Sequence, residues 1–277
     1  MSDVYYCNGE FVPAAEAAVP VDDLALLRGF GVFEFLRTYN GRPFGLDQHL
    51  ARLEGSARFI SLELPMSLAD IAGVVHETLS RNSHPESNIR IVVTGGSSPD
   101  FITPSDNPRL IVMVTALRRC PEWWYERGVK VALVPVSRAF PRAKSIAYVQ
   151  AVVSMRAARE QGAVEALYVD RENRVLEGTT SNVFIVSGGE LVTPEQGVLP
   201  GVTRGVVLEI AAGILPVTRR SIIRDELFRA EEIFITATNK EVVPVVAVDE
   251  APVGDGAPGP MTKRIMEAFA RRVGKTT

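Results

Sequence analysis

The sequence has few of the residues that most often build metal centres. Only two cysteines, Cys7 and Cys120, and three histidines occur among its 277 residues. The histidines are His49, His76 and His84. None of these side chains falls in the spacing of a metal-ligand motif. We therefore expect a metal-free protein of the cytosol.

A charge excess and a long apolar run are also missing. The 33 acidic and 30 basic residues leave a net charge of -3, which argues against a dedicated nucleic-acid binder because such a protein needs a concentrated basic face. No apolar run reaches about 18 residues, so no membrane-spanning helix is expected. Residues 1–10 have neither a basic start nor an apolar core, so we expect no secretory signal there. The 46% hydrophobic content excludes a mainly disordered chain and supports a sizeable core, with more than one domain.

Lysine is scarce among the basic residues. Arginine accounts for 25 of the 30 and lysine for five, a bias that high-GC coding would explain. The scarcity narrows any lysine chemistry to five candidates: Lys130, Lys144, Lys240, Lys263 and Lys275. Lys263 and Lys275 fall in a charged terminal segment and Lys130 in a strand, and surface roles are expected for these three. Lys240 falls in a turn.

Hydrophobic periodicity predicts two α+β domains. Strands are expected over 5–12 (a hairpin around Asn8-Gly9), 31–39, 42–44, 89–94, 110–115, 129–136, 166–169, 182–186, 232–236 and 242–248. Helices are expected over 46–60, 68–81, 147–161, 203–212 and 261–273. A linker, 118–124, is expected between a small N-terminal domain, 1–117, and a larger C-terminal domain, 125–277. Small-molecule sites often lie at such junctions.

Lys144 is the lysine best placed for chemistry. It stands between Phe140-Pro141-Arg142 and the helix expected over 147–161. A lysine held there, partly desolvated and near other cations, can have a depressed pKa and form a Schiff base with an aldehyde cofactor or a carbonyl substrate. From position alone, a capping or salt-bridging lysine is the alternative.

Glu177 is the candidate acid. It stands between the apolar Leu176 and the small polar run Gly178-Thr179-Thr180-Ser181, which suits a side chain that points into a cleft. Beside a heteroaromatic cofactor, this carboxylate would keep a ring nitrogen protonated and make the ring an electron sink. The alternative is an acid in a turn that faces water.

Two segments are suited to bind a phosphate. Leu199–Thr203 precedes the helix expected over 203–212, where free amides and the helix dipole attract an anion and Thr203 adds a hydroxyl. Thr236–Asn239 ends a strand with small and hydroxylic residues that permit close backbone approach. Arg52, at the edge of the buried face of the helix expected over 46–60, would supply a cation. An ordinary N-cap threonine and a solvated arginine are the alternatives.

Taken together, these residues resemble the class IV aminotransferases, the fold-type IV enzymes that depend on pyridoxal 5'-phosphate. The resemblance covers nearly the whole chain, and the order and spacing of its segments are specific although each segment alone is not. The segments are Asn8-Gly9, Arg28–Glu34, His49–Leu53, Lys144-Ser145, Glu177–Phe184, Leu199–Arg204 and Thr236–Thr238. The resemblance implies an α+β fold of two α/β domains, a site at their junction, and a homodimer.

The resemblance also implies a role for each candidate residue. Lys144 matches the lysine that forms the Schiff base with the cofactor and moves the proton between Cα and C4'. Glu177 matches the carboxylate on the pyridine nitrogen. Tyr148 falls close to a tyrosine that hydrogen-bonds the pyridine O3' in several members. The residues that fall where the family binds the cofactor phosphate are Arg52, Val202, Thr203, Ala237 and Thr238. The implied reaction is a ping-pong transfer of an amino group from an amino acid to a 2-oxo acid.

The branch of the family depends on how the substrate α-carboxylate is held, and a bidentate arginine is the natural tool. Arg28 and Arg90 lie in segments that line the substrate pocket in relatives; surface or inter-subunit ion pairs are the alternative. Together with Thr94–Asp100 they resemble an atypical group of D-amino-acid transaminases, so we expect substrates such as D-alanine or D-glutamate. Asn88 and Ile91 stand where branched-chain enzymes usually carry a tyrosine and an arginine. The alternatives are a branched-chain L-amino-acid aminotransferase, an aminodeoxychorismate lyase and a non-catalytic cofactor-binding protein.

Overall fold

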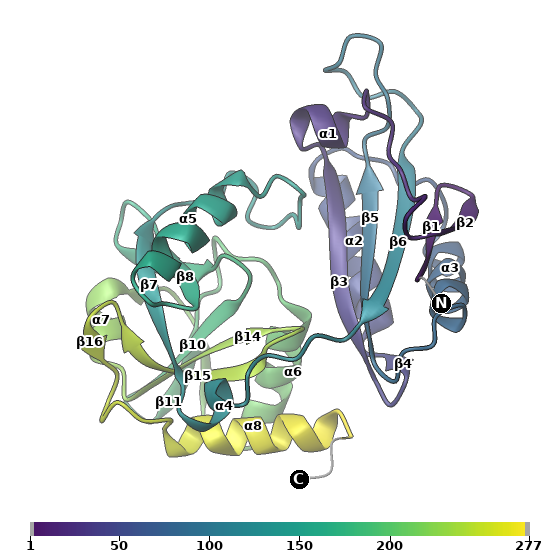
Figure 1. The fold of residues 1–277 in the computed structure, drawn as a ribbon. Coiled ribbons are helices and arrows are strands. Elements are labelled where there is room, and N and C mark those ends of the chain that lie inside the picture. The colour runs from purple at the N-terminus through teal and green to yellow at the C-terminus, as the bar shows by residue number, and fades with distance from the viewer. Residues whose placement is uncertain (1–2, 275–277) are drawn as a thin grey trace. The chain divides into compact units, whose positions relative to one another are not determined.

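The computed structural model describes residues 3–274 and divides into two compact units (Figure 1). The first unit contains the residues up to Arg118 together with Arg142–Tyr148, and the second contains Arg119–Pro141 and the residues from Val149 onward. Each unit combines a sheet with helices, so the predicted α+β, two-domain fold class is confirmed. Within residues 3–274, every helix is too short or too polar to cross a membrane.

The first unit is built on a six-stranded antiparallel sheet with the order β2-β1-β6-β5-β3-β4. Its strands are β1 (Val4–Cys7), β2 (Glu10–Pro13), β3 (Gly31–Tyr39), β4 (Arg42–Pro43), β5 (Ser87–Thr94) and β6 (Arg109–Ala116). Its helices are α1 (Leu24–Arg28), α2 (Leu46–Phe59) and α3 (Leu68–Ser80). The helix α3 begins at the predicted capping arrangement, because Ser67 Oγ accepts a hydrogen bond from Asp70 N.

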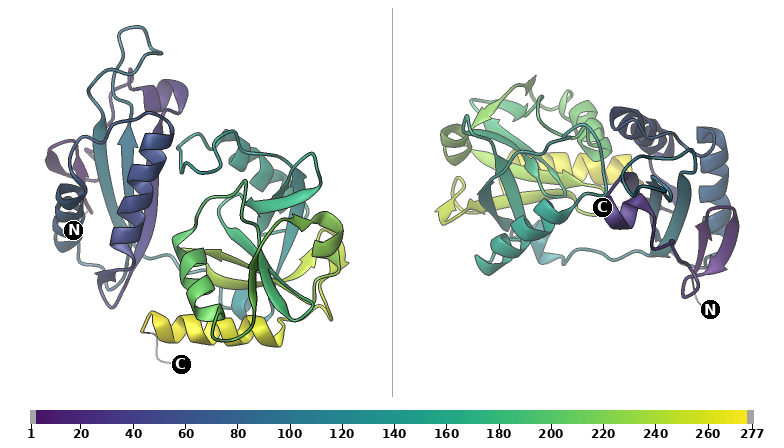
Figure 2. Two further views of the ribbon diagram at one scale, coloured as in Figure 1. Left: turned by 180° about the vertical axis from the view of Figure 1, so that it is seen from behind. Right: turned by 90° about the horizontal axis from the view of Figure 1, so that it is seen from above.

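Helices α2 and α3 cover one face of this sheet (Figure 2). Leu53 of α2 and Ile71 of α3 pack there against alternate strand residues such as Ile89 and Ile91. Because side chains alternate along a strand, Arg90 of β5 points to the opposite face. The sheet therefore separates an apolar core from a face that carries a functional candidate.

Residues 142–148 belong to the first unit although they follow a strand of the second unit in sequence. Their backbone runs beside the start of β3: Phe33 N donates to Lys144 O at 2.9 Å, and Ile146 N donates to Gly31 O at 3.1 Å. Since β4 pairs with the other end of β3, it leaves this edge of β3 open to the segment. Lys144 is thereby fixed to the first unit by backbone hydrogen bonds.

The second unit contains a ten-stranded mixed sheet with the order β12-β11-β10-β14-β15-β7-β8-β9-β13, and β16 pairs with β15. Its strands are β7 (Val129–Pro135), β8 (Glu165–Val169), β9 (Arg174–Gly178), β10 (Asn182–Ser187), β11 (Glu190–Thr193), β12 (Val217–Arg219), β13 (Ile222–Ile223), β14 (Glu232–Ala237), β15 (Glu241–Val248) and β16 (Ala251–Pro252). Its helices are α4 (Trp123–Glu126), α5 (Val149–Glu160), α6 (Val202–Ala211), α7 (Arg224–Phe228) and α8 (Pro260–Arg272).

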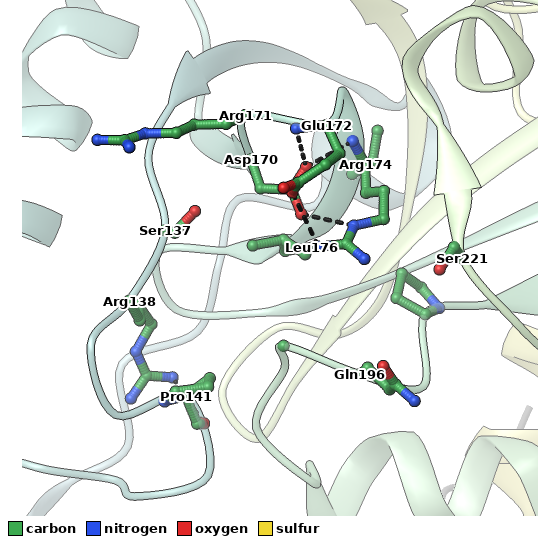
Figure 3. Close-up of a pocket in the computed structure, with 13 residues that line it drawn as sticks. Ser137, Arg138, Pro141, Asp170, Arg171, Glu172, Arg174, Leu176, Gln196 and Ser221 are labelled. Carbon is green, nitrogen blue, oxygen red and sulfur yellow. Dashed lines mark hydrogen bonds and ion pairs between the residues drawn. The ribbon is translucent and has the colours of Figure 1, made fainter.

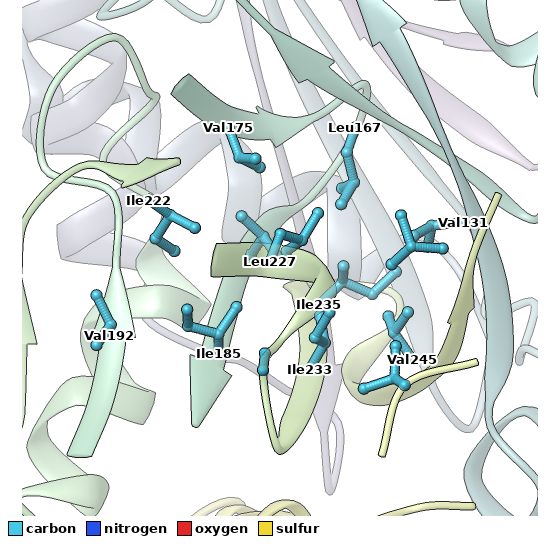
Figure 4. Close-up of a cluster of buried hydrophobic side chains, with 14 of the residues drawn as sticks. Val131, Leu167, Val175, Ile185, Val192, Ile222, Leu227, Ile233, Ile235 and Val245 are labelled. Carbon is cyan, nitrogen blue, oxygen red and sulfur yellow. The ribbon is translucent and has the colours of Figure 1, made fainter. Parts of the chain in front are cut away.

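Strands from both ends of this sheet contribute to one hydrophobic core (Figure 4). Val192 of β11 and Ile222 of β13 belong to the same buried cluster as Ile235 of the central strand β14. Strands so far apart in a sheet can share a core only if the sheet curls around it. Outside this core, α5 packs on β7 and β8, and α6 and α8 pack on β14.

The predicted long elements are all present, with ends that differ by at most about two residues. The prediction missed β9, β11, β12, β13, β16, α1, α4 and α7. These elements have two to five residues, too few to show a period. Part of the segment predicted as a linker, 118–124, forms the first turn of α4.

Candidate active site

Lys144 is held at the edge of β3 in the first unit. Its backbone N donates to Ser56 Oγ at 3.1 Å, and its carbonyl accepts from Phe33 N at 2.9 Å. The ammonium lies 4.5 Å from the centroid of the Phe33 ring, a distance typical of a cation–π contact. Hydrogen bonds on both sides of the residue therefore restrict where the half-buried amine can reach.

Phe33 is the common neighbour of three predicted site residues. Besides Lys144, the guanidinium of Arg90 lies 5.1 Å from its ring centroid and the ring of Tyr148 lies edge-on at 5.4 Å. Arg90 is also 5.3 Å from the ring of Phe35, so its guanidinium stacks between two aromatic side chains. The first unit thus gathers Lys144, Arg90 and Tyr148 around one ring.

Arg28 lies in the last turn of α1, where its Nη1 donates to Leu27 O at 2.8 Å. The helix ends at Gly29, whose positive φ of 64° allows the left-handed cap. A β-carbon at Gly29 would lie 3.6 Å from that of Ala147. The cap therefore brings the end of α1 next to the segment that carries Lys144.

Arg52 is not the solvated arginine that its position on α2 allowed. Its Nε and Nη2 donate to the two carboxylate oxygens of Glu34 at 2.8 and 2.7 Å, and His49 Nδ1 lies 2.7 Å from the same carboxylate. Burial alone would raise the pKa of Glu34, but Arg52 and His49 lower it to about 2. Burial also lowers the pKa of His49, with help from the charges of Arg52 and Lys144 and against the effect of Glu34. The pairing with Glu34 fixes the direction of the Arg52 guanidinium.

The remaining lysines have other environments. Lys130 pairs with Glu250 at 2.6 Å, and Lys263 is exposed on α8. Lys240 is only 6% exposed and pairs with the buried Glu165. Its burial is a finding that the sequence did not predict, because the partner is 75 residues away in the chain. Lys275 lies outside the described residues.

Glu177, in the second unit, is 3% exposed, so the alternative of an acid that faces water is wrong. Its carboxylate accepts hydrogen bonds from Arg138 Nη1 at 2.7 Å, from Leu199 N at 2.9 Å and from Asn182 Nδ2 at 3.4 Å. A buried carboxylate surrounded by donors is stabilised in its charged form. The side chain can therefore hold a positive charge on a neighbouring nitrogen.

The sequence did not predict Arg138 as a partner of Glu177. The only local signal is its position six residues before Lys144. In the structure Arg138 lines a cavity with Pro141, Leu176 and Gln196 (Figure 3). The ion pair therefore connects Glu177 to the wall of a cavity in the second unit.

The start of α6 has free backbone amides, as a phosphate site needs, but it lies one residue earlier than predicted. The prediction began the helix at Thr203, whereas the helix begins at Val202 after the N-cap Gly201. No side chain within residues 3–274 caps it, so the amides of its first turn remain available for an anion. Thr203 is the second residue of the helix and is buried.

The second predicted phosphate segment leaves the sheet beside Asn182. Asn182 of β10 pairs with Thr236 of the antiparallel neighbour β14. The residues before 182 and those after 236 therefore lie at the same end of these two strands. Ala237 and Thr238 follow there in a turn in which Lys240 N donates to Ala237 O at 3.2 Å. Asn182 Nδ2 also donates to Leu199 O at 2.9 Å, close to the start of α6. The second unit therefore brings Glu177, Val202, Thr203, Ala237 and Thr238 to the same end of the strands β10 and β14.

Two further observations concern the kind of ligand that this end of the strands could bind. The hydroxyl of Thr236 is buried and has no hydrogen-bond partner among the described residues. Across the same part of the chain, no three His, Cys, Asp or Glu side chains are grouped as metal ligands. Hydroxyls and backbone amides are among the donors at this end of the strands, and such donors suit an anion.

The chain is similar to known proteins over most of its length. The model of the amino-transferase class IV family matches residues 31–248. The chain is 36% identical to the putative branched-chain-amino-acid aminotransferase of Methanocaldococcus jannaschii, over 95% of this chain and 94% of that one. It is 32% identical to the D-alanine aminotransferase of Bacillus licheniformis, over 96% and 95%. The structure of the branched-chain aminotransferase of Thermoproteus uzoniensis with norvaline superposes with a TM-score of 0.88, at 30% identity over 99% of this chain and 95% of that one.

Proposed function

Because this chain belongs to the class IV aminotransferases, we propose that it transfers the amino group of D-amino acids, such as D-alanine or D-glutamate, to 2-oxo acids. Its cofactor is pyridoxal 5'-phosphate. When bound, the cofactor supplies an aldehyde that captures the amino group and a ring that stores the electrons released at Cα. We further propose that the protein works in the cytoplasm as a homodimer.

The candidate residues of each unit, taken separately, have the chemistry that this cofactor needs. The uncapped start of α6, the buried hydroxyl of Thr236 and the adjacent turn at Ala237-Thr238 form a donor set for a phosphate. We propose that Val202, Thr203, Ala237 and Thr238 bind it and that Arg52 supplies the positive charge. The buried carboxylate of Glu177 matches a protonated ring nitrogen.

Lys144 has two tasks in this proposal. Its amine holds the cofactor aldehyde between turnovers, and once displaced it accepts the proton from the substrate Cα and returns it at C4'. The ring of Phe33, 4.5 Å from the ammonium, limits the positions that the amine can take. Tyr148, which packs on the same ring, is proposed to hydrogen-bond the pyridine O3'.

The preference for D-amino acids rests on the arginines. The guanidinium of Arg90 is stacked between Phe33 and Phe35, which fixes the plane of its donors for a bidentate contact with a carboxylate. Arg28 is proposed as a second contact from the end of α1. The 32% identity to a D-alanine aminotransferase supports this assignment.

A branched-chain L-amino-acid aminotransferase is the second candidate. It is favoured by the 36% identity to a relative with that name and by the fold shared with branched-chain enzymes. Both candidates depend on pyridoxal 5'-phosphate, so the substrate distinguishes them.

Single-turnover reactions with paired enantiomers separate the two candidates. We expect D-alanine or D-glutamate to convert the bound cofactor to its amine form faster than L-alanine or L-glutamate does, as followed by absorbance. The control substrates are L-valine and L-leucine. Faster conversion by either of these would assign the protein to the branched-chain enzymes.

The lysine assignment has its own test. The purified protein is expected to be yellow from the lysine-bound cofactor, and Lys144→Ala is expected to lose that visible absorption band. Lys263→Ala, which alters an exposed lysine of α8, is the matched control and is expected to keep it. Persistence of the band in Lys144→Ala would overturn the assignment, and Lys240 would be the next lysine to examine.

A further inference from the structure

Two tight turns lie side by side at the edge of the second unit where the cofactor residues gather. The turn Gly178–Ser181 is closed by a hydrogen bond from Gly178 N to Ser181 O at 2.7 Å, and the turn Ala237–Lys240 by one from Lys240 N to Ala237 O at 3.2 Å. They are neighbours because Asn182, after the first turn, pairs with Thr236, before the second. Backbone pairing brings the turns together but does not determine how the second one is oriented.

A fully buried carboxylate, Glu165 of β8, reaches the first turn from the neighbouring part of the sheet. Its Oε1 accepts hydrogen bonds from Ala166 N, Thr179 N and Thr179 Oγ1. Its Oε2 accepts from Thr180 Oγ1 at 2.8 Å and from Ser181 Oγ at 3.0 Å. Every residue between Gly178 and Asn182 therefore donates to this one side chain.

Lys240 connects the second turn to the same carboxylate. Its ammonium donates to Glu165 Oε2 at 2.5 Å and to Thr180 Oγ1 at 2.6 Å. Burial raises the pKa of Glu165, but Lys240 and the threonine hydroxyls lower it below its ordinary value overall. The pair is thus a salt bridge between the last residue of one turn and the carboxylate that holds the other.

Stability alone is a weak reason for such a pair. Removing two charges from water carries a large free-energy cost that their attraction must offset, and an apolar pair of similar volume is often no less stable. What an ion pair adds is a fixed direction for its partners. Here those partners are the turn that carries Ala237 and Thr238, and the turn that leads to Asn182.

Asn182 extends the connection to the third cofactor segment. It donates to Leu199 O at 2.9 Å, and a β-carbon added to Gly201 would lie 2.0 Å from its Oδ1. The N-cap of α6 therefore packs directly on the residue that follows the first turn. Movement of that turn would be transmitted to Val202 and Thr203.

We propose that Lys240 and Glu165 are positioning residues that hold the Ala237–Lys240 turn in the orientation needed to bind the cofactor phosphate. This inference rests on the proposed phosphate site. The pair acts through the turn, because its charged groups are used by each other and by Thr179, Thr180 and Ser181.

The test compares Lys240→Met with the wild type by equilibrium dialysis of the holoenzyme. The dissociation constant for pyridoxal 5'-phosphate is expected to rise by about 10–100-fold, by analogy with the loss of metal affinity when residues that orient metal-binding side chains are replaced. Binding of pyridoxal, which lacks the phosphate, to the same protein after cofactor removal is expected to change by less than about twofold, a difference of only a few tenths of a kcal/mol. Lys240→Arg, which keeps the charge, is expected to restore part of the affinity.

Glu232→Gln is the matched control. Glu232 is another buried carboxylate of the second unit, but it accepts from Met261 N and Thr262 N at the start of α8 and not from either turn. This variant is expected to lower the melting temperature without changing the affinity for pyridoxal 5'-phosphate. If Lys240→Met does not fold, Glu165→Gln is measured in the same way.

Three results would overturn the proposal. The affinity of Lys240→Met or Glu165→Gln for pyridoxal 5'-phosphate could equal that of the wild type, the two ligands could weaken equally, or Glu232→Gln could weaken binding as much. Failure of the proposed function is a different observation, because the wild type would then lack the phosphate-dependent gain over pyridoxal, or Lys144→Ala would keep the visible band.

Discussion

At the scale of single residues, Glu34 fixes the side chains of Arg52 and His49 in the first unit. Its carboxylate is completely buried and accepts hydrogen bonds from Nε and Nη2 of Arg52. His49 Nδ1 also contacts it. Such a bidentate geometry leaves the guanidinium little freedom. The phosphate role proposed for Arg52 therefore depends on a partner that lies on β3, not on its own helix.

The pH dependence of stability tests this pair. The unfolded carboxyl protonates near 4.5 and the folded one near a pKa of about 2, so the contribution is complete above pH 4.5 and is lost as the pH falls toward 2. We expect the wild type to lose ~3 kcal/mol of unfolding free energy over that range from this group, and Glu34→Gln to lack that loss. Urea unfolding between pH 7 and pH 2 measures it.

Glu54→Gln serves as the control for Glu34→Gln. Glu54 pairs with Arg58 at 3.4 Å on the surface of α2, the helix that carries Arg52, and both side chains are exposed. Its replacement is expected to change stability by less than ~1 kcal/mol at either pH. An equal pH dependence in the wild type and in Glu34→Gln would show that the carboxylate does not contribute in this way.

At the scale of elements, the start of α6 depends on a glycine. Gly201 has an ordinary φ of -64°, so another residue could adopt its backbone conformation. The constraint is steric, because a β-carbon there would lie 2.0 Å from Asn182 Oδ1. Asn182 is buried and bonded to Leu199 O, so it cannot move away without losing that hydrogen bond.

Alanine substitution at two glycines of this element is expected to have opposite effects. Gly201→Ala should weaken binding of pyridoxal 5'-phosphate on the order of tenfold, which corresponds to about 1.4 kcal/mol. Gly205→Ala, inside α6 with no described neighbour within 4 Å of its added carbon, should retain the cofactor and stabilise the helix by ~0.5–1 kcal/mol. Cofactor titration and thermal unfolding measure the two effects; unchanged affinity in Gly201→Ala would contradict the steric argument.

At the scale of the whole molecule, α5 presents an apolar face to solvent. Val149, Val152 and Val153 are 80%, 65% and 64% exposed, and their spacing places them on one side of the helix. Three exposed valines together on one helix face are unusual for a surface that stays in water. We expect the second copy of this chain in the proposed homodimer to cover them.

Charged residues on this face are therefore expected to disrupt the dimer. The double variant Val152→Glu with Val153→Glu should lower the mass measured by light scattering from twice 30.2 kDa to 30.2 kDa. Gln150→Glu adds a charge at another exposed position of α5 and should leave the mass unchanged. A monomeric wild type, or a dimeric double variant, would show that this face is not the interface.

Local patterns in the sequence were sufficient for most of the fold. Hydrophobic periodicity predicted α2, α3, α5, α6 and α8 because each buries one stripe along more than two turns. Short elements such as β13 and α7 were missed because two to five residues show no period. Their positions depend on distant partners, as in the pairing of Ile222 with Val175.

By itself, the sequence determined the class of the fold, the family and the order of the candidate residues. These depend on local hydrophobic patterns and on the spacing of short segments along the chain. Only the tertiary structure decided that Lys144 is fixed to β3, that Arg52 is held by Glu34 and that Lys240 is buried against Glu165. The physical reason is that an ion pair or a hydrogen bond depends on distance in space. Partners 75 residues apart in the chain leave no local pattern.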